Sequence, residues 1–279
     1  MGFDTTALAN GPAAFAAANG LGYAPVGTAN HFGGAVFEYL QGASTYEVYR
    51  STSGRLFEVG TISGRVGGGQ TRTEGGWTVR ISYSSTEHRT YGYIAIQLER
   101  AVPQLVLDAK RNGESIPMAI GGGQTLSLEG DFDRHFTLYA PQGYERDALY
   151  IMTPDLMALL IDETGDLDVE VVDDMLFVYA TAPFDTRSAA VWERIGRIRD
   201  VVGAKAIRQT DFYRDDRRAS TTAAPITEQG RRLRLGFLGT KSNKTLMIAI
   251  VAGVLGFVVL VFGIVIAVFA ALLSSMPRF

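Results

Sequence analysis

The sequence predicts an α+β protein, in which an antiparallel sheet domain with a few helices is followed by a single C-terminal transmembrane helix. Two observations predict the domain. Short runs rich in β-branched and aromatic residues occupy residues 35–109, and clear helix starts follow before residue 213. Strands first and helices later are typical of α+β folds. A third observation, an uncharged apolar run from Leu246 to Leu273, predicts the membrane helix.

The N-terminal arm, residues 1–34, is expected to contain one short helix. Proline at a first turn and Asn-Gly after a last turn favour a helix over Ala13–Ala18, because Gly11-Pro12 precedes it and Asn19-Gly20 follows it. We expect the glycine-rich residues 22–34 to be a loop. The first residues have neither a basic nor an apolar region, so they do not resemble a signal peptide.

The antiparallel sheet is expected between residues 35 and 109. Glycine-containing turns separate most of its predicted strands, and Gly67–Gly69 is one such turn. The fourth and fifth strands, joined across Ser85–Thr90, are predicted to pair as a hairpin. In order, the predicted strands are VFEYL, TYEVYRS, RLFEVGTI, WTVRISYS, YGYIAIQL and QLVLDA.

Two helices and a second hairpin are predicted after residue 150. Thr153–Asp155 supplies an N-cap, a first-turn proline and a first-turn acid for a helix that ends near Gly165. LDVEVV and MLFVYAT flank Asp173-Asp174 and are expected to form a hairpin with a tight acidic turn. A last helix is expected to begin near Thr186–Ser188, with Gly203 as its cap. Its apolar stripe is Trp192, Ile195, Ile198 and Val202.

The run from Leu246 to Leu273 is longer than the roughly 20 apolar residues that cross a bilayer as a helix. Basic residues are retained on the cytoplasmic side of a membrane helix. Five basic residues precede the run, and Arg278 alone follows it. Lysine occurs only at 110, 205, 241 and 244, and this arginine bias, with the many Ala and Gly residues, suggests a GC-rich bacterial genome. We therefore expect a bacterial inner-membrane protein with a cytoplasmic N-terminal domain and Phe279 outside. The flanking basic residues are Arg231, Arg232, Arg234, Lys241 and Lys244.

These observations divide the chain into five parts. The predicted parts are an arm at 1–34, a cytoplasmic α+β domain at 35–213, a basic flexible linker at 214–245, a transmembrane helix at 246–273 and a short extracytoplasmic tail at 274–279. The chain is therefore expected to be a single-pass, tail-anchored protein whose first partner is the lipid bilayer.

Small residues recur along one stripe of the predicted membrane helix. Such a stripe lets a second helix approach closely, either another copy of the chain or a subunit of a larger complex. The alternative is a plain anchor, because Gly and Ala are common in membrane helices. The residues that would pack are Ala249, Gly253, Gly256, Gly263 and Ala267.

Charge and cysteine content exclude some functions. The chain carries a net charge of −3, and basic residues outnumber acidic ones after residue 213, so the domain itself is acidic and poorly suited to nucleic acid. The chain has no cysteine, which excludes disulfides and thiolate metal sites. No cofactor is expected.

Candidate metal and phosphate motifs are weak. His31, His88 and His135 are far apart, whereas a zinc site needs three or four ligands. The alternating acids of 166–170, with Asp173 and Asp174, lack the spacing of a calcium loop and are better explained as a solvated hairpin edge. GGGQT occurs at 67–71 and 121–125 without the lysine of a phosphate loop, so both copies are expected to be inter-strand loops.

Five stretches of the chain resemble a group of uncharacterised actinobacterial membrane proteins. The resemblance covers most of residues 13–200 and is most specific over Gly130–Asp162. It implies a soluble domain joined to a hydrophobic segment and brings no assigned activity and no catalytic residue. The matching stretches are AFAAANGLGY, RLFEVGTI, YGYIAIQLER with PQLVLDA, SLEGDFDRHFTLYAPQGYERDALYIMTPDLMALLID, and LDVEVVDDMLFVYA.

The sequence favours a non-enzymatic domain that binds a protein partner at the inner membrane face. One alternative is an enzyme of unknown reaction that uses Asp131, Asp133 and Glu145; another is a lipid-headgroup or small-ligand binding domain. A pocket where Asp, Glu and His converge would favour the enzyme, and an exposed apolar patch would favour the partner-binding domain.

Overall fold

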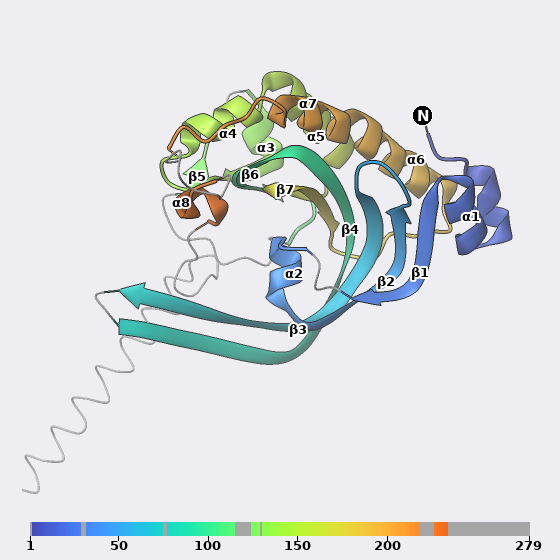
Figure 1. Cartoon of the computed structure of the whole chain (residues 1–279), viewed down its shortest axis with the longest axis horizontal. Coiled ribbons are helices and arrows are strands. Elements are labelled where there is room, and N and C mark those ends of the chain that lie inside the picture. The colour runs from blue at the N-terminus through green and yellow to red at the C-terminus, as the bar shows by residue number, and fades with distance from the viewer. Residues whose placement is uncertain are drawn as a thin grey trace, which may run out of the picture. The chain divides into compact units, whose positions relative to one another are not determined.

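A curved antiparallel sheet, with α2 on one face and the longer helices on the other, is the frame of the structure (Figure 1). The computed structural model describes residues 2–28, 32–74, 77–114, 124–128, 130–217 and 226–233, with the backbone alone at 67–74 and 77–86. All of these residues belong to one compact unit. The predicted α+β class with an antiparallel sheet and several helices is confirmed.

Seven strands form the sheet of the described residues, in the order β1-β2-β3-β4-β6-β5, with β7 paired to β4. Every pairing is antiparallel. The strands are β1 (Leu21–Thr28), β2 (Leu40–Ser51), β3 (Phe57–Glu74), β4 (Trp77–Ala109), β5 (Thr125–Leu126), β6 (Phe136–Tyr139) and β7 (Asp168–Ala180).

Two predicted turns lie inside long strands instead. Ser85–Thr90 runs through β4, so the hairpin predicted across these residues is wrong. β4 pairs instead with β3, as far as Glu74 opposite Trp77. Gly67–Gly69 lies within β3, where Gly67 pairs with Ser84 and a register shift precedes it. Glycine in a strand often marks a local irregularity of this kind and not a chain reversal.

The predicted hairpin around Asp173 is also wrong, because β7 is one strand that pairs with β4 along its length. Asp173 has φ of +50° and opposes Val102 at two register shifts. Aspartate tolerates this left-handed conformation better than most residues. The acidic pair therefore marks a bulge that bends the strand, where the sequence suggested a reversal.

Helices precede and follow the sheet. Helix starts and ends agree with the predictions for α1 and α5, and α6 begins after Ser188 as expected. The bounds are η1 (Thr5–Asn10), α1 (Pro12–Ala18), α2 (Ala35–Tyr39), α3 (Phe132–His135), α4 (Glu145–Ile151), α5 (Pro154–Thr164), α6 (Ala189–Arg197), η2 (Ile198–Gly203), α7 (Ala204–Thr210) and α8 (Glu228–Arg231).

Gly203 does not cap a helix. Its backbone is helical, with φ of −60° and ψ of −47°, and α6, η2 and α7 follow one another without a break. A Cβ atom at Gly203 would lie 2.8 Å from Cδ1 of Ile96 on β4. The missing side chain therefore serves close packing of η2 on the sheet, and the cap prediction fails for that reason.

Two further local predictions fail near the N-terminus. The expected loop at 22–34 contains β1, an edge strand whose pairing with β2 outweighs the poor strand propensity of its Gly, Ala and Pro residues. The expected strand VFEYL is mostly α2, whose first backbone N–H, that of Ala35, donates to the buried Glu170 carboxylate at 2.7 Å. In both places a tertiary contact decides the local structure.

Two apolar clusters fill the two faces of the sheet. The larger lies under α1 and α5–α7, and there Trp192 packs at 4.4 Å from Phe15 and 4.8 Å from Tyr49 between ring centroids. The predicted stripe of α6 and η2 is buried as expected. The smaller cluster lies around α2, where Phe37 packs on Phe177. These clusters hold the helices against the sheet, and the candidate sites lie on the outer surfaces of these elements.

Candidate functional site

The carboxylates of the Asp131–Glu145 region do not converge on a pocket. Asp133 accepts hydrogen bonds from the Ser127 hydroxyl and from the backbone N–H of Leu128. These bonds, chiefly the one from Ser127, hold the pKa of Asp133 below its ordinary value. Asp131 is exposed, with an oxygen 4.0 Å from Nε2 of His135. Glu145 is exposed and accepts a backbone N–H two residues before it. Asp133 and Glu145 therefore accept hydrogen bonds from their own turns, an arrangement unsuited to paired acid–base chemistry.

The acids of 166–170 are not the solvated edge that we predicted. Asp166 is exposed and pairs with Arg194, but Asp168 is buried and accepts N–H groups from Ala109 at 2.8 Å and Asn112 at 2.9 Å. Burial raises the pKa of Asp168 to about 7. Within the described part of the chain, no three His, Asp or Glu side chains gather as a metal site requires.

Glu170 is fully buried and joins three parts of the chain. Its carboxylate accepts hydrogen bonds from the Ala35 N–H at 2.7 Å, the Gln104 amide at 2.7 Å and the Tyr179 hydroxyl at 2.9 Å. Burial raises the pKa of Glu170 to about 7. The amide oxygen of Gln104 accepts a hydrogen bond from the backbone N–H of Leu233 at 2.7 Å. This network therefore holds α2 and the segment 226–233 to the sheet.

Part of the segment predicted as a flexible linker packs on the domain. Asp215 accepts the Tyr144 hydroxyl at 2.7 Å and the Thr227 N–H at 3.0 Å, which closes the chain between 215 and 227. Ile226 and Leu233 are buried. Buried apolar side chains with satisfied backbone groups give residues 214–217 and 226–233 a fixed position that basic composition alone did not indicate.

Two of the five predicted membrane-flanking basic residues lie in this segment. Arg231 and Arg232 lie 3.5 Å and 3.2 Å from carboxylate oxygens of Asp173, and Arg232 also lies 3.4 Å from Glu38. The bulge of β7 thus faces the basic segment. The remaining three, Arg234, Lys241 and Lys244, lie outside the described residues, as do Ala249, Gly253, Gly256, Gly263 and Ala267.

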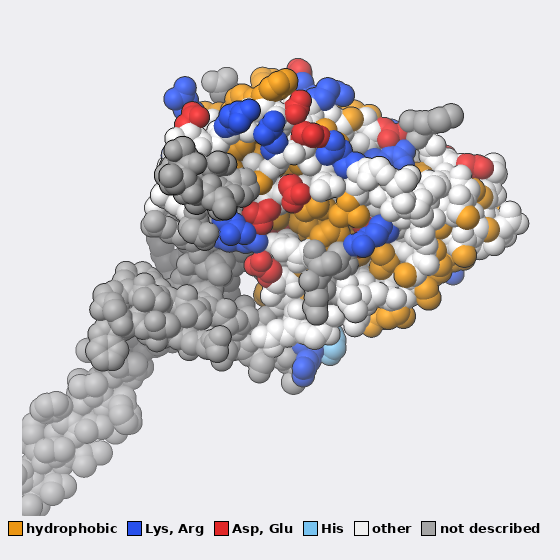
Figure 2. Space-filling model, viewed as in Figure 1, with side chains coloured by type: hydrophobic (Ala, Val, Ile, Leu, Met, Phe, Trp, Pro, Cys, Tyr) orange, Lys and Arg blue, Asp and Glu red, His pale blue; other side chains and the backbone are white. Residues whose placement is uncertain are grey.

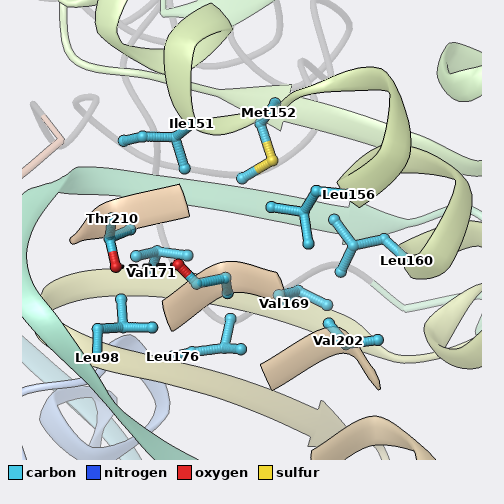
Figure 3. Close-up of a pocket in the computed structure, with 11 residues that line it drawn as sticks. Leu98, Ile151, Met152, Leu156, Leu160, Val169, Val171, Leu176, Val202 and Thr210 are labelled. Atoms are coloured by element: carbon cyan, nitrogen blue, oxygen red, sulfur yellow. Dashed lines mark hydrogen bonds between the residues drawn. The ribbon is translucent and has the colours of Figure 1, made fainter. Parts of the chain in front are cut away.

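An enclosed void lies in the larger core, between β4, β7 and the helices (Figure 3). Its volume is about 10 Å³ and its lining is apolar apart from Thr210, whose hydroxyl donates to the Ala206 carbonyl at 2.9 Å. A void of this size holds at most one water molecule, and an apolar lining keeps it dry. The void is a packing defect and not a ligand site.

An open groove of about 420 Å³ lies over β1 and β2, on the α2 face of the sheet. Gly22, Ala24 and Thr28 of β1 line it, with Val48 and Arg50 of β2. At its floor the fully buried Glu58 accepts the Tyr93 hydroxyl at 2.6 Å and the Nε–H of Arg50. Burial, reinforced by the Glu58 charge, raises the pKa of Tyr93 far above its ordinary value.

An exposed apolar patch lies where α4 meets the end of α7. Phe212 is 79% exposed, and Leu149 and Tyr150 of α4 are also exposed. The two elements are tied together because the Gln209 amide donates to the Tyr150 carbonyl at 2.6 Å and the rings of Tyr150 and Tyr213 lie 6.2 Å apart. Figure 2 shows hydrophobic and basic side chains side by side over this end of the molecule. We call Leu149, Tyr150 and Phe212 the apolar patch.

Sequence reasoning missed both the groove and the patch. Arg50 and Glu58 lie on different strands, and only their pairing in register brings them together. Leu149 and Phe212 have ordinary helical surroundings in the sequence. A usable signal was present at Phe212, an aromatic residue between Asp211 and Tyr213 that lies beyond the apolar stripe of the last helix.

No protein-family model and no curated protein matches the chain. A solved structure, that of the mycobacterial trehalose monomycolate transport factor A, TtfA, is similar with a TM-score of 0.45 and 12% sequence identity, over 73% of this chain and 92% of that one. Such a partial likeness identifies no function, because one fold hosts many activities.

The predicted membrane helix, 246–273, lies outside the residues that the structure describes. Among the helices of the described part, none has the length and apolar character needed to cross a bilayer.

Proposed function

We propose that this chain is a single-pass membrane protein whose folded domain binds a protein partner through the apolar patch. The observation that carries the proposal is the exposure of Phe212 after α7 and of Leu149 and Tyr150 on α4, two elements that Gln209 joins through its bond to Tyr150. Large apolar side chains grouped on a folded surface are typical of interaction sites, and aromatic residues supply most of the binding energy where proteins meet.

The surroundings of the patch favour a protein over a lipid surface. Arg146, Arg208 and Arg214 are exposed nearby in the chain, and none forms an ion pair with another described residue. Exposed acids, Glu145 and Asp216, lie in the same stretches. Arginine and aromatic residues are enriched at protein interfaces, and mixed charge suits the polar rim of such an interface better than an anionic membrane.

The membrane part of the proposal rests on the apolar run from Leu246 to Leu273. The basic residues before it favour a domain on the cytoplasmic side of a bacterial inner membrane, with the tail outside. Small residues along the run favour pairing with a second membrane helix, from another copy or from the partner itself. The resemblance to actinobacterial membrane proteins supports the same arrangement.

Photo-crosslinking in native membranes tests the proposal. A benzophenone amino acid replaces Phe212 in the full-length chain, and a matched control replaces Val26, which is 63% exposed on the far edge strand β1. We expect discrete protein adducts from position 212 and none of the same mass from position 26. Phe212→Asp should weaken the purified complex by roughly 30-fold or more, as an interface hot spot does. Adducts with lipid alone, or no adducts, would show that the patch does not bind a protein.

The enzyme alternative loses support because Asp133 and Glu145 each accept a nearby backbone N–H and Asp131 is exposed beside His135. The small-ligand alternative has a specific observation in its favour, which is the groove over β1 and β2.

A further inference from the structure

We propose that the groove over β1 and β2 binds a small organic carboxylate, held by the guanidinium of Arg50. The groove volume of about 420 Å³ falls within the range of small-molecule sites, which combine an apolar lining with a few convergent polar groups. This site is separate from the apolar patch, which lies on α4 and after α7.

The charges of the groove favour an anionic group. Arg50 and Glu58 are the two charged residues among those that line it. The Glu58 side chain is fully buried, whereas that of Arg50 is 45% exposed. Solvent and ligand therefore meet the positive member of the pair. Arg50 donates to Glu58 through Nε, which leaves the N–H groups of its two terminal nitrogens for a ligand.

The guanidinium is held in position before any ligand arrives. Glu58 accepts hydrogen bonds from Nε of Arg50 and from the Tyr93 hydroxyl. The Tyr93 ring in turn packs against Phe37 of α2, with 5.0 Å between the ring centroids. A side chain fixed in this way loses little conformational entropy on binding. The planar fork of an arginine matches the two oxygens of a carboxylate.

The same pair argues against a highly charged ligand. Because Glu58 already offsets the charge of Arg50, little net positive charge remains to stabilise a phosphate dianion. Beyond Arg50 the lining combines small or apolar residues, Gly22, Ala24 and Val48 among them, with the hydroxyl side chains Thr28, Thr45, Ser51 and Thr52. A singly charged carboxylate on a short apolar body suits both the fork and these walls.

Fluorescence titration of the full-length chain in detergent tests the site. The chain has no cysteine, so Thr28→Cys places one environment-sensitive dye at the exposed rim of the groove. The probes are hexanoate, acetate and inorganic phosphate. We expect a saturable response with hexanoate, weaker binding of acetate and still weaker binding of phosphate.

Three substitutions in the labelled chain complete the test. Arg50→Lys removes the fork and should weaken hexanoate binding by roughly tenfold or more. Gly22→Val should do the same by filling the groove. A Cβ at Gly22 would meet nothing closer than 3.8 Å, so the backbone has room for this substitution, which leaves the Arg50 and Glu58 side chains unchanged. Arg55→Lys, at an arginine that pairs with Glu99 outside the groove, is the matched control and should bind like the parent.

Three results would overturn the proposal. One is the lack of a saturable response to any carboxylate. Another is a Gly22→Val variant that binds hexanoate as the parent does. The third is phosphate binding that is tighter than hexanoate binding and depends on Arg50.

Discussion

Gln104 is the side chain through which the segment 226–233 is held to the sheet, so its replacement should free that segment. Gln104→Met keeps the side-chain length and removes both hydrogen bonds. The Leu233 N–H, buried with its residue, loses its acceptor, and Glu170 loses one of its three donors. The fold of the sheet should survive because the change keeps the side-chain length and adds no charge.

The expected magnitude follows from the buried N–H group. A buried donor left without a partner costs about 1–3 kcal/mol. This cost is paid only while the segment is docked, so the free energy of its local opening should fall by the same amount. A fall of that size raises the open population, and with it the rate of proteolysis, by about 5- to 150-fold.

Tryptic cleavage measures the opening directly. The bonds after Arg231 and Arg232 lie in the segment, and both side chains are engaged by Asp173 while it is docked. Mass spectrometry of the full-length chain in detergent gives the rate at these two bonds. Gln209→Met is the matched control, because it removes a glutamine hydrogen bond, to the Tyr150 carbonyl, that does not involve the segment 226–233. Equal rates in the parent and in Gln104→Met would refute the assignment of Gln104 as the link.

Three further predictions concern stability and assembly. Burial raises the pKa of Glu170 from 4.5 to about 7, so the folded state binds this proton more tightly than the unfolded state does. The free energy of unfolding should therefore fall by about 3 kcal/mol as the pH rises from 4.5 through 7. Denaturant titrations that show a rise in stability over this pH range would contradict the prediction. Trp192→Ala should cost about 3–5 kcal/mol in the same assay, since it empties a fully buried aromatic site; a loss below about 1 kcal/mol would mean that the ring cluster is not a core. Gly256→Ile should weaken association in a membrane two-hybrid assay while Leu260→Ile should not; equal signals from both would leave the apolar run as a plain anchor.

Three helices of the domain, α1, α5 and α6, could be predicted because their signals are local. Thr153 and Pro154 start α5 and the stripe from Trp192 to Val202 is buried, as capping chemistry and a 3.6-residue period indicate. Predictions failed where a contact with a residue distant in the sequence decides the local structure. Glu170 caps the backbone at α2, and Ile96 takes the space beside Gly203.

The sequence by itself determined the class of the protein. Periodicity, caps and charge follow from neighbours along the chain, so they indicate an acidic α+β domain before a long apolar run. The same local information could not distinguish a bulge from a turn at Asp173, because both favour the same residue types.

Only the tertiary structure decided where the candidate sites lie. Arg50 meets Glu58 across two strands, and Tyr150 meets Gln209 across two helices, through contacts that no local pattern encodes. Burial likewise separates Asp168 and Glu170 from Asp166, although all three alternate along one stretch of chain. The physical reason is that register, burial and exposure are properties of packed elements, and they arise only when distant segments share one core.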